Sequence, residues 1–106
     1  MSAFEDREKG FERKFASDQE QEFRAQSRAS RMLGEWAAKK MGLENVDDYV
    51  RAVVRSELGP GGEEDVARKV IQDLSGAGIE VRESEVRSKA DEFLAVAREQ
   101  VKAGGE

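Results

Sequence analysis

Apolar residues recur at helical spacing in four separate segments of the chain. The first segment runs from about residue 23 to residue 41, and charged side chains occupy the opposite half of its helical wheel. Its apolar half consists of Phe23, Ala29, Met32, Leu33, Trp36, Ala37 and Met41. Gly42 follows at the position where glycine commonly ends a helix. The pattern therefore predicts one amphipathic helix, with Trp36 in the core.

The second segment begins and ends with clear signals. Asn45 can cap a helix N-terminus, and the acidic residues 47 and 48 place negative charge at the positive end of the helix dipole. The apolar stripe that follows is Val46, Tyr49, Val50, Val53, Val54 and Leu58. A Gly-Pro-Gly-Gly run at residues 59–62 then ends the helix. We interpret this run as a turn, because the Gly-Lys-Ser/Thr sequence of a phosphate-binding loop does not follow it.

Two further helices are predicted after this turn. Acidic residues 63–65 open the third helix, and the Gly-containing residues 75–78 end it. Its inner face is Val66, Val70, Ile71, Leu74 and Ala77. Residues 79–81 alternate between apolar and charged, but they are too few for a strand, so we expect a hydrophobic linker that closes the end of the bundle. Ser84 is expected to cap the fourth helix, whose inner face is Val86, Ala90, Phe93, Leu94, Ala97 and Val101.

The connections between these helices are short, which favours antiparallel neighbours. The sequence has one Pro and no Thr, a composition that disfavours strands and permits long helices. We therefore predict an all-α fold in which residues 20–106 form a four-helix bundle-like domain.

The N-terminal residues 1–19 are predicted to form a separate arm. Phe4, Phe11 and Phe15 lie within about 40° of one another on a helical wheel. No large apolar residue stands between Ala16 and Phe23, so this stripe is separate from the apolar face of the body. One helix from residue 3 to residue 41 would be roughly 60 Å long, whereas a globule of this size is about 35 Å across. We therefore expect a projecting, partly disordered or loosely helical arm that becomes ordered on a partner.

The Phe stripe has two interpretations. It is either the core-facing edge of a helix or a set of anchors that an amphipathic helix inserts into a groove of a partner. The length of the arm favours anchors, and the interleaved charged residues would then add ionic contacts at the rim: Arg7, Arg13, Lys14 and Asp18. A second surface, the basic residues Arg24, Arg28 and Arg31, is either simply solvated or in contact with an acidic partner.

Composition and charge narrow the class of function. The chain has 106 residues, of which 39% are charged, and its net charge is −5. The first 31 residues are balanced between acids and bases, so the body carries the whole excess, which disfavours nucleic acid as a partner. There is no Cys and no His. The carboxylates of residues 5–8 diverge by about 100° per helical position and cannot converge on a metal, and those of residues 63–65 are better explained by the dipole of a helix N-terminus. We predict no catalytic residue, no cofactor and no metal, hence a binding protein and not an enzyme.

Neither a signal peptide nor a run of about 20 apolar residues is present, so we expect no membrane insertion and a cytoplasmic protein.

Five sequence runs carry a resemblance to a known family. They are FEDRE at residues 4–8, FERKFASD at 11–18, LGEWAA at 33–38, GEEDVARKV at 62–70 and EVRSKADE at 85–92. Together these runs span nearly the full chain, and the chain resembles the zeta family of alphaproteobacterial ATP synthase inhibitors.

The resemblance implies a specific function. Members of that family are four-helix proteins that suppress ATP hydrolysis by F-type ATP synthase. They insert the N-terminal region into a catalytic interface between the α and β subunits, near the γ stalk. Carried over to this sequence, the resemblance implies that the arm binds the α, β and γ subunits, and that the protein lies at the inner membrane only through the ATP synthase. The residues implied for this contact are Phe4, Arg7, Phe11, Lys14, Phe15 and Asp18.

The family is functionally analogous to the mitochondrial ATPase inhibitor, but this sequence departs from that protein. It has no long heptad-bearing C-terminal helix and no His, so we expect a monomer whose inhibition does not respond to pH through His titration. The turn at residues 59–62 does not match the family pattern. The alternative function is a helical regulatory module that binds a small ligand or nucleotide without inhibiting an ATPase.

Overall fold

The computed structural model describes the backbone of residues 3–104 and the side chains of residues 18–104. Within that part of the chain there are four helices and no strand. They are α1 (Ala3–Met41), α2 (Val46–Ser56), α3 (Glu63–Gly76) and α4 (Glu83–Lys102). The predicted all-α class and the four predicted helices are confirmed.

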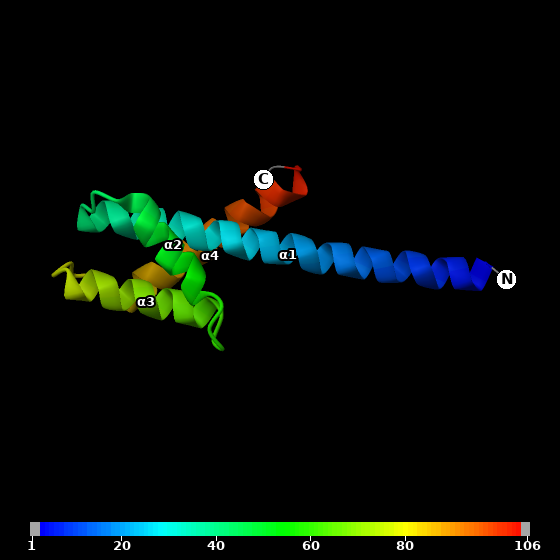
Figure 1. Cartoon of the computed structure of the whole chain (residues 1–106), viewed down its shortest axis with the longest axis horizontal. Coiled ribbons are helices and arrows are strands. Elements are labelled where there is room, and N and C mark those ends of the chain that lie inside the picture. The colour runs from blue at the N-terminus through cyan, green and yellow to red at the C-terminus, as the bar shows by residue number, and fades with distance from the viewer. Residues whose placement is uncertain (1–2, 105–106) are drawn as a thin grey trace.

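Successive helices run in opposite directions, and the three shorter ones gather around the C-terminal half of α1 (Figure 1). The helices α2 and α4 pack on different sides of α1 and do not contact each other. The N-terminal half of α1 extends beyond all three, which makes the molecule elongated, with extents of 65 × 26 × 22 Å. The predicted projection of the arm is therefore confirmed, and the arm is continuous with the first helix of the bundle.

The core has two parts that meet along α1. The first joins all four helices and is formed by Leu33, Ala37, Val53, Val66, Val70, Leu74 and Val86, all almost fully buried. Trp36, Ile79 and Val81 are partly buried against it, as expected for a core tryptophan and for a linker that closes the bundle end. The second part joins α1 to α4 through Ala25, Ala29, Ala97 and Val101. Small alanines on both helices keep the two backbones close, so α4 follows α1 toward the base of the arm.

The two predicted helix caps have different outcomes. Asn45 caps α2 as predicted, because its side-chain oxygen accepts a hydrogen bond from the Asp48 backbone N–H at 3.1 Å. Ser84 does not cap α4, since the helix already begins at Glu83. The residue at the cap position is Arg82, which has extended backbone angles and makes no side-chain capping bond. Acidic Glu83 and Glu85 in the first turn remain favourable to the helix dipole.

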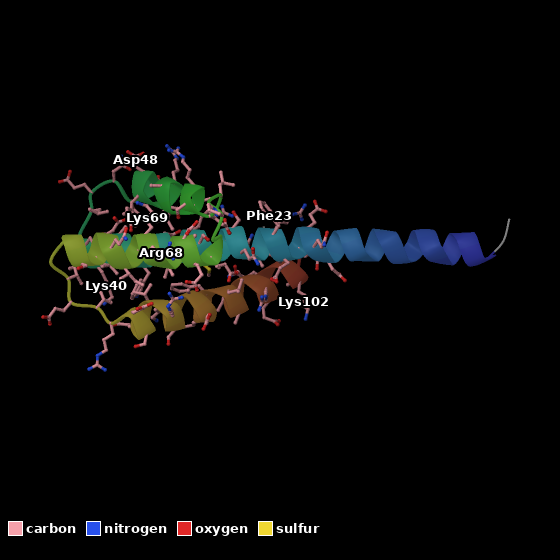
Figure 2. The ribbon with its side chains drawn as sticks, turned by 90° about the horizontal axis from the view of Figure 1, so that it is seen from below. Phe23, Lys40, Asp48, Arg68, Lys69 and Lys102 are labelled. Atoms are coloured by element: carbon pink, nitrogen blue, oxygen red, sulfur yellow. The ribbon has the colours of Figure 1, made fainter. Side chains whose placement is uncertain are left out.

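Two large apolar residues assigned to the core from the pattern are on the surface. Phe23 is 63% exposed and Leu58 is 80% exposed. Phe23 is on the apolar half of the helical wheel of residues 23–41. In the structure it lies on the side of α1 toward α2, close to the base of the arm (Figure 2). Leu58 continues the spacing of α2, but the helix ends at Ser56 and the residue falls in the following turn. Periodicity was correct in placing Phe23 in a helix and wrong in extending the second helix to Leu58, and for both residues it was wrong about burial.

A polar contact joins α2 to α3 at the edge of the core. The Tyr49 hydroxyl donates a hydrogen bond to Asp73 Oδ2 at 2.8 Å, and Lys69 Nζ lies 3.0 Å from the same oxygen. Lys69 Nζ also stands 5.6 Å from the centre of the Tyr49 ring. Burial, together with the hydrogen bond to the Asp73 carboxylate and its charge, raises the pKa of Tyr49 above its usual value. The hydroxyl therefore stays protonated and keeps its role as donor.

Replacing Tyr49 with Phe is expected to lower the free energy of unfolding by about 1 kcal/mol, because one partly buried hydrogen bond to a charged acceptor is lost. For a domain of this size that loss corresponds to a melting temperature lower by about 4–8 °C. Thermal unfolding followed by circular dichroism measures it. The control is the same substitution in an Asp73→Ala background, where it should cost much less; equal costs in the two backgrounds would show that the contact contributes nothing.

Candidate functional site

The candidate site is the N-terminal part of α1, where the structure describes only the backbone. The helix is unbroken from Ala3 to Met41. Five of the six residues implied for partner binding have side chains outside the described residues: Phe4, Arg7, Phe11, Lys14 and Phe15. Their roles, and a loosely helical state of the unbound arm, stay predictions. The sixth residue, Asp18, is exposed and lies at the base of the arm.

The backbone of α1 defines which way the Phe positions face. Positions 18 residues apart in an α-helix are separated by about five complete turns and therefore lie on the same side. Phe11 is in this relation to Ala29, and Phe15 to Leu33. Ala29 packs against α4 and Leu33 lies in the bundle core. The Phe positions thus share the side of α1 that the bundle covers further along the helix, although polar residues 17–22 separate the two stripes.

Ionic contacts attach the base of the arm to the C-terminal end of α4. Arg98 Nε donates hydrogen bonds to both carboxylate oxygens of Glu22, at 2.8 and 3.1 Å. This contact raises the pKa of Arg98 above its usual value, so the guanidinium stays charged. Six residues further along α1, Arg28 donates a hydrogen bond to Gln100 at 3.0 Å. The C-terminal part of α4 is therefore attached to α1 just after the last residue of the arm.

Asp18 lines a shallow hollow beside these contacts. Arg98 and Lys102 of α4 line the same hollow, and Lys102 lies at the tip of that helix (Figure 2). Positive charge near the C-terminus of a helix is favourable to its dipole, and here it also faces the acidic base of the arm. The structure thus brings Asp18 close to the end of α4, which sequence reasoning did not predict.

The basic face predicted on α1 does not act as one surface. Arg24 pairs with Glu20 on its own helix at 3.1 Å, and Arg28 is turned toward α4. Arg31 instead borders a groove between α1 and α2. Neighbouring helices divide these three side chains among them, which a single helical wheel cannot reveal.

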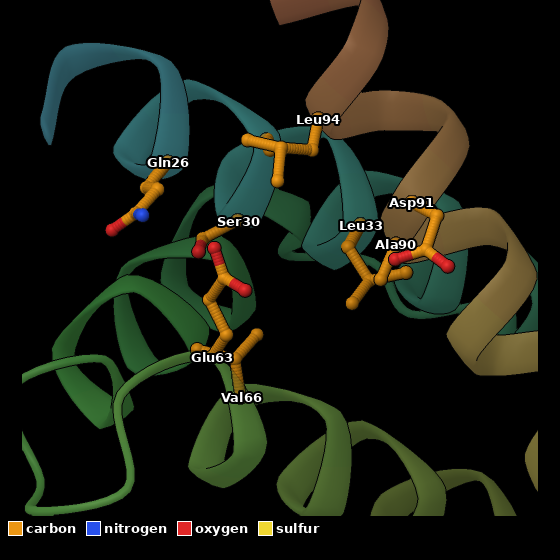
Figure 3. A pocket seen from close by; sticks show the side chains of 9 residues that line it. Gln26, Ser30, Leu33, Glu63, Val66, Ala90, Asp91 and Leu94 are labelled. Atoms are coloured by element: carbon orange, nitrogen blue, oxygen red, sulfur yellow. The ribbon is translucent and has the colours of Figure 1, made fainter. Parts of the chain in front are cut away.

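A small cavity lies where α1, α3 and α4 meet (Figure 3). Its volume is about 40 Å³, and its lining includes Ser30, Leu33 and Val66. The Glu63 side chain reaches from α3 toward Ser30 across the opening (Figure 3). Pockets that enclose a small organic ligand have volumes of about 300–1,000 Å³, so this cavity is too small to enclose a nucleotide. Within residues 18–104, no three carboxylates are grouped as they would be in a metal site.

Glu57 occupies an unfavourable position at the end of α2. Partial burial raises the pKa of its carboxyl group above the usual value, the Ser30 hydroxyl beside it acts in the opposite direction, and the charge of Glu63 raises it further. Glu57 is also the C-terminal cap residue of α2, where the helix dipole disfavours negative charge.

Replacing Glu57 with Gln is expected to raise the melting temperature at pH 7, because Gln removes the charge and keeps an acceptor for Ser30. A carboxyl group whose pKa is raised on folding stabilises the fold when protonated, and this contribution disappears as the pH rises through the folded-state pKa. The gain from Gln should therefore shrink as the pH falls through the raised folded-state pKa, and it should be smallest once the pH is below the ordinary Glu value of 4.5. Thermal melts between pH 3 and pH 8 measure it, with Glu80→Gln as an exposed control; a gain that does not change with pH would contradict this assignment.

Comparison with known protein families gives a match over most of the chain. The model of the family described as ATPase inhibitor subunit zeta matches residues 1–100, which includes the whole arm and nearly all of the bundle. No curated protein matches the chain closely enough to count as a relative.

Proposed function

The chain belongs to the ATPase inhibitor subunit zeta family, and on that basis we propose that it inhibits ATP hydrolysis by F-type ATP synthase through its arm. In this proposal residues 1–19 insert into a catalytic interface between the α and β subunits, near the γ stalk. Residues 20–106 form the domain that carries the arm. Phe4, Phe11 and Phe15 are the apolar anchors, and Arg7, Lys14 and Asp18 make ionic contacts around them.

The observation that carries the proposal is the continuity of α1. This helix is about 58 Å long at 1.5 Å per residue, and the other helices flank only its C-terminal half (Figure 1). A helix that belongs to a packed bundle at one end and projects at the other can enter a narrow interface without unfolding the bundle. The Phe positions lie on the same side of α1 that α4 covers at Ala25 and Ala29. Beyond the end of α4, a partner would cover this side of the arm.

Insertion of the arm would act on the movement of the ATPase. Hydrolysis requires catalytic interfaces to open and close, and a helix held between subunits prevents closure. The apolar stripe supplies most of the binding energy in such a helix-in-groove contact, and charged side chains fix its orientation. Inhibition by this route needs no catalytic group on the inhibitor.

The location of the protein follows from its partner. No helix in the described part of the chain is long and apolar enough to cross a membrane. Association with ATP synthase would hold the protein at the cytoplasmic side of the inner membrane without insertion of its own. We propose that it is a monomer when free.

The proposal is tested by titrating the protein into a purified F-type ATPase head from an alphaproteobacterium. The intact chain should suppress ATP hydrolysis, and a chain lacking residues 1–18 should not. The shortened chain should keep its helical circular dichroism and its melting transition, because the bundle core lies between Ala25 and Val101. Hydrolysis that the intact chain leaves unchanged would refute the proposal.

The alternative function, a bundle that binds a small ligand or nucleotide, has less support. The cavity inside the bundle is too small to enclose a nucleotide. Binding that survives removal of residues 1–18, together with unchanged hydrolysis, would favour that alternative.

A further inference from the structure

A second apolar surface lies on the bundle, outside the arm. It is a groove of about 410 Å³ between α1 and α2, which we call the α1–α2 groove. Phe23 of α1, Val50 and Val54 of α2, and Leu58 in the turn after α2 form its apolar lining. Phe23 and Leu58 are the two most exposed large apolar residues in the described part of the chain. Apolar side chains gathered in this way and rimmed by charge are typical of interaction sites.

The rim of the groove is basic although the protein as a whole is acidic. Arg31, Arg51 and Arg55 border it, and Glu57 is the one carboxylate among its lining residues. Arg51 is 3.6 Å from Asp48, whereas Arg31 and Arg55 make no ion pair with any carboxylate of residues 18–104. On a chain of net charge −5, two unpaired guanidinium groups beside exposed Phe and Leu side chains select for an acidic ligand.

The groove also lies next to the arm. Phe23 follows Asp18 on the same helix by about 7.5 Å of rise, and it faces the side of α1 on which α2 lies (Figure 2). A partner that surrounds the arm up to its base therefore reaches Phe23. The polar contacts of Glu22 and Arg28 with α4 occupy another side of α1 and leave the groove accessible.

We propose that the α1–α2 groove binds a second segment of the protein that holds the arm, namely an acidic helix or loop with a large apolar side chain between carboxylates. The apolar side chain packs between Phe23 and Leu58, and the carboxylates pair with Arg31 and Arg55. This inference rests on the proposed function, since it assumes that the arm has a protein partner. A second copy of this chain fits less well, because a two-fold contact would bring two basic rims together.

The test compares two groove variants of the full chain with matched controls. Leu58→Ser removes an apolar contact, and the pair Arg31→Gln with Arg55→Gln removes rim charge. Val96→Ser, at an exposed apolar residue of α4, is the control for the first. Arg68→Gln with Arg82→Gln, at exposed positions outside the groove, is the control for the second. Affinity for the ATPase head is measured by calorimetry at several salt concentrations, and inhibition is measured in parallel.

Leu58→Ser is expected to weaken affinity about tenfold, which is the effect of losing about 1.4 kcal/mol. The arginine pair should weaken affinity several-fold at low salt and make it less dependent on salt. Inhibition at saturation should equal that of the unaltered chain, because the arm is intact. The control variants should bind normally.

Three results would overturn the proposal. Groove variants that bind and inhibit like the unaltered chain refute the groove alone and leave the function of the arm standing. A dimer seen by sedimentation that Leu58→Ser abolishes would assign the groove to a second copy. An intact chain that does not bind the head at all refutes both proposals, whereas binding without inhibition, weakened by the groove variants, refutes only the proposed function.

Discussion

Replacing Phe11 and Phe15 together with Ser is expected to weaken inhibition of ATP hydrolysis at least about a hundredfold, since burying one Phe side chain contributes about 1.5–3 kcal/mol. The melting temperature of the bundle should not change, because both positions precede the part of α1 that the other helices flank (Figure 1). The measurements are the concentration for half-inhibition of a purified ATPase head and a thermal melt of the free protein.

The control for this prediction places serine on the opposite side of the same helix. Asp6→Ser with Lys9→Ser leaves the net charge unchanged, and both positions lie about 140–160° from the middle of the Phe stripe on a helical wheel. It weakens the helix through serine to a comparable extent but keeps all three Phe side chains. Inhibition should change little. If the control variant inhibits ATP hydrolysis as weakly as the Phe variant does, the stability of the arm helix determines inhibition, and apolar contact does not.

Replacing Gly34 with Val is expected to destabilise the bundle by at least about 2 kcal/mol, through overpacking between α1 and α2. A Cβ atom at Gly34 would already lie 3.3 Å from the Val50 Cα and 3.3 Å from the Val53 Cβ. One of these atoms is backbone, so the two additional methyl groups of Val force the helices apart. The melting temperature should fall by about 8 °C or more, at 4–8 °C per kcal/mol.

Two further glycine variants separate crowding from helix propensity. Gly34→Ala should be nearly neutral, because the crowding of one methyl group opposes a gain of about 1 kcal/mol in helix propensity. Gly76→Val, at a glycine of α3 where a Cβ would meet nothing within 4 Å, should be tolerated. If Gly34→Val melts like the unaltered protein, the close approach of α1 and α2 at this position is not a constraint on the fold.

Most of the fold was predictable because helix signals in this chain are local. Gly42 follows α1, Asn45 caps α2, and the Gly-rich residues 59–62 separate α2 from α3, as the sequence indicates. These features depend on residues within one turn of each other, so tertiary structure does not override them. The wrong cap at Ser84 is an error of two positions, since the cap residue is Arg82, and α4 still begins in the predicted turn.

The burial of single apolar residues was not predictable in the same way. The positions of Phe23 and Leu58 on a helical wheel are apolar-facing, but exposure depends on how far the neighbouring helix extends. The division of Arg24, Arg28 and Arg31 among different neighbours has the same origin. Of the candidate arm site, the sequence predicts the stripe and its projection, whereas the contacts of Glu22 with Arg98 require the packing of α4. The identity of the proposed partner comes from the family match, and neither the helical pattern of the sequence nor the packing of the helices reveals it.

Because α1 is unbroken, the arm and the first helix of the bundle are parts of one continuous helix. Each residue of an α-helix turns the chain by about 100°, so the number of residues between arm and bundle sets the rotational phase of one against the other. Phe23 and Phe15 differ in phase by about 80°, and the groove therefore points to the flank of the arm's apolar side. A partner that holds the Phe side chains thereby also fixes which flank of the bundle it meets. One residue inserted near the base of the arm would keep every side chain and still rotate the bundle by about 100° relative to the arm.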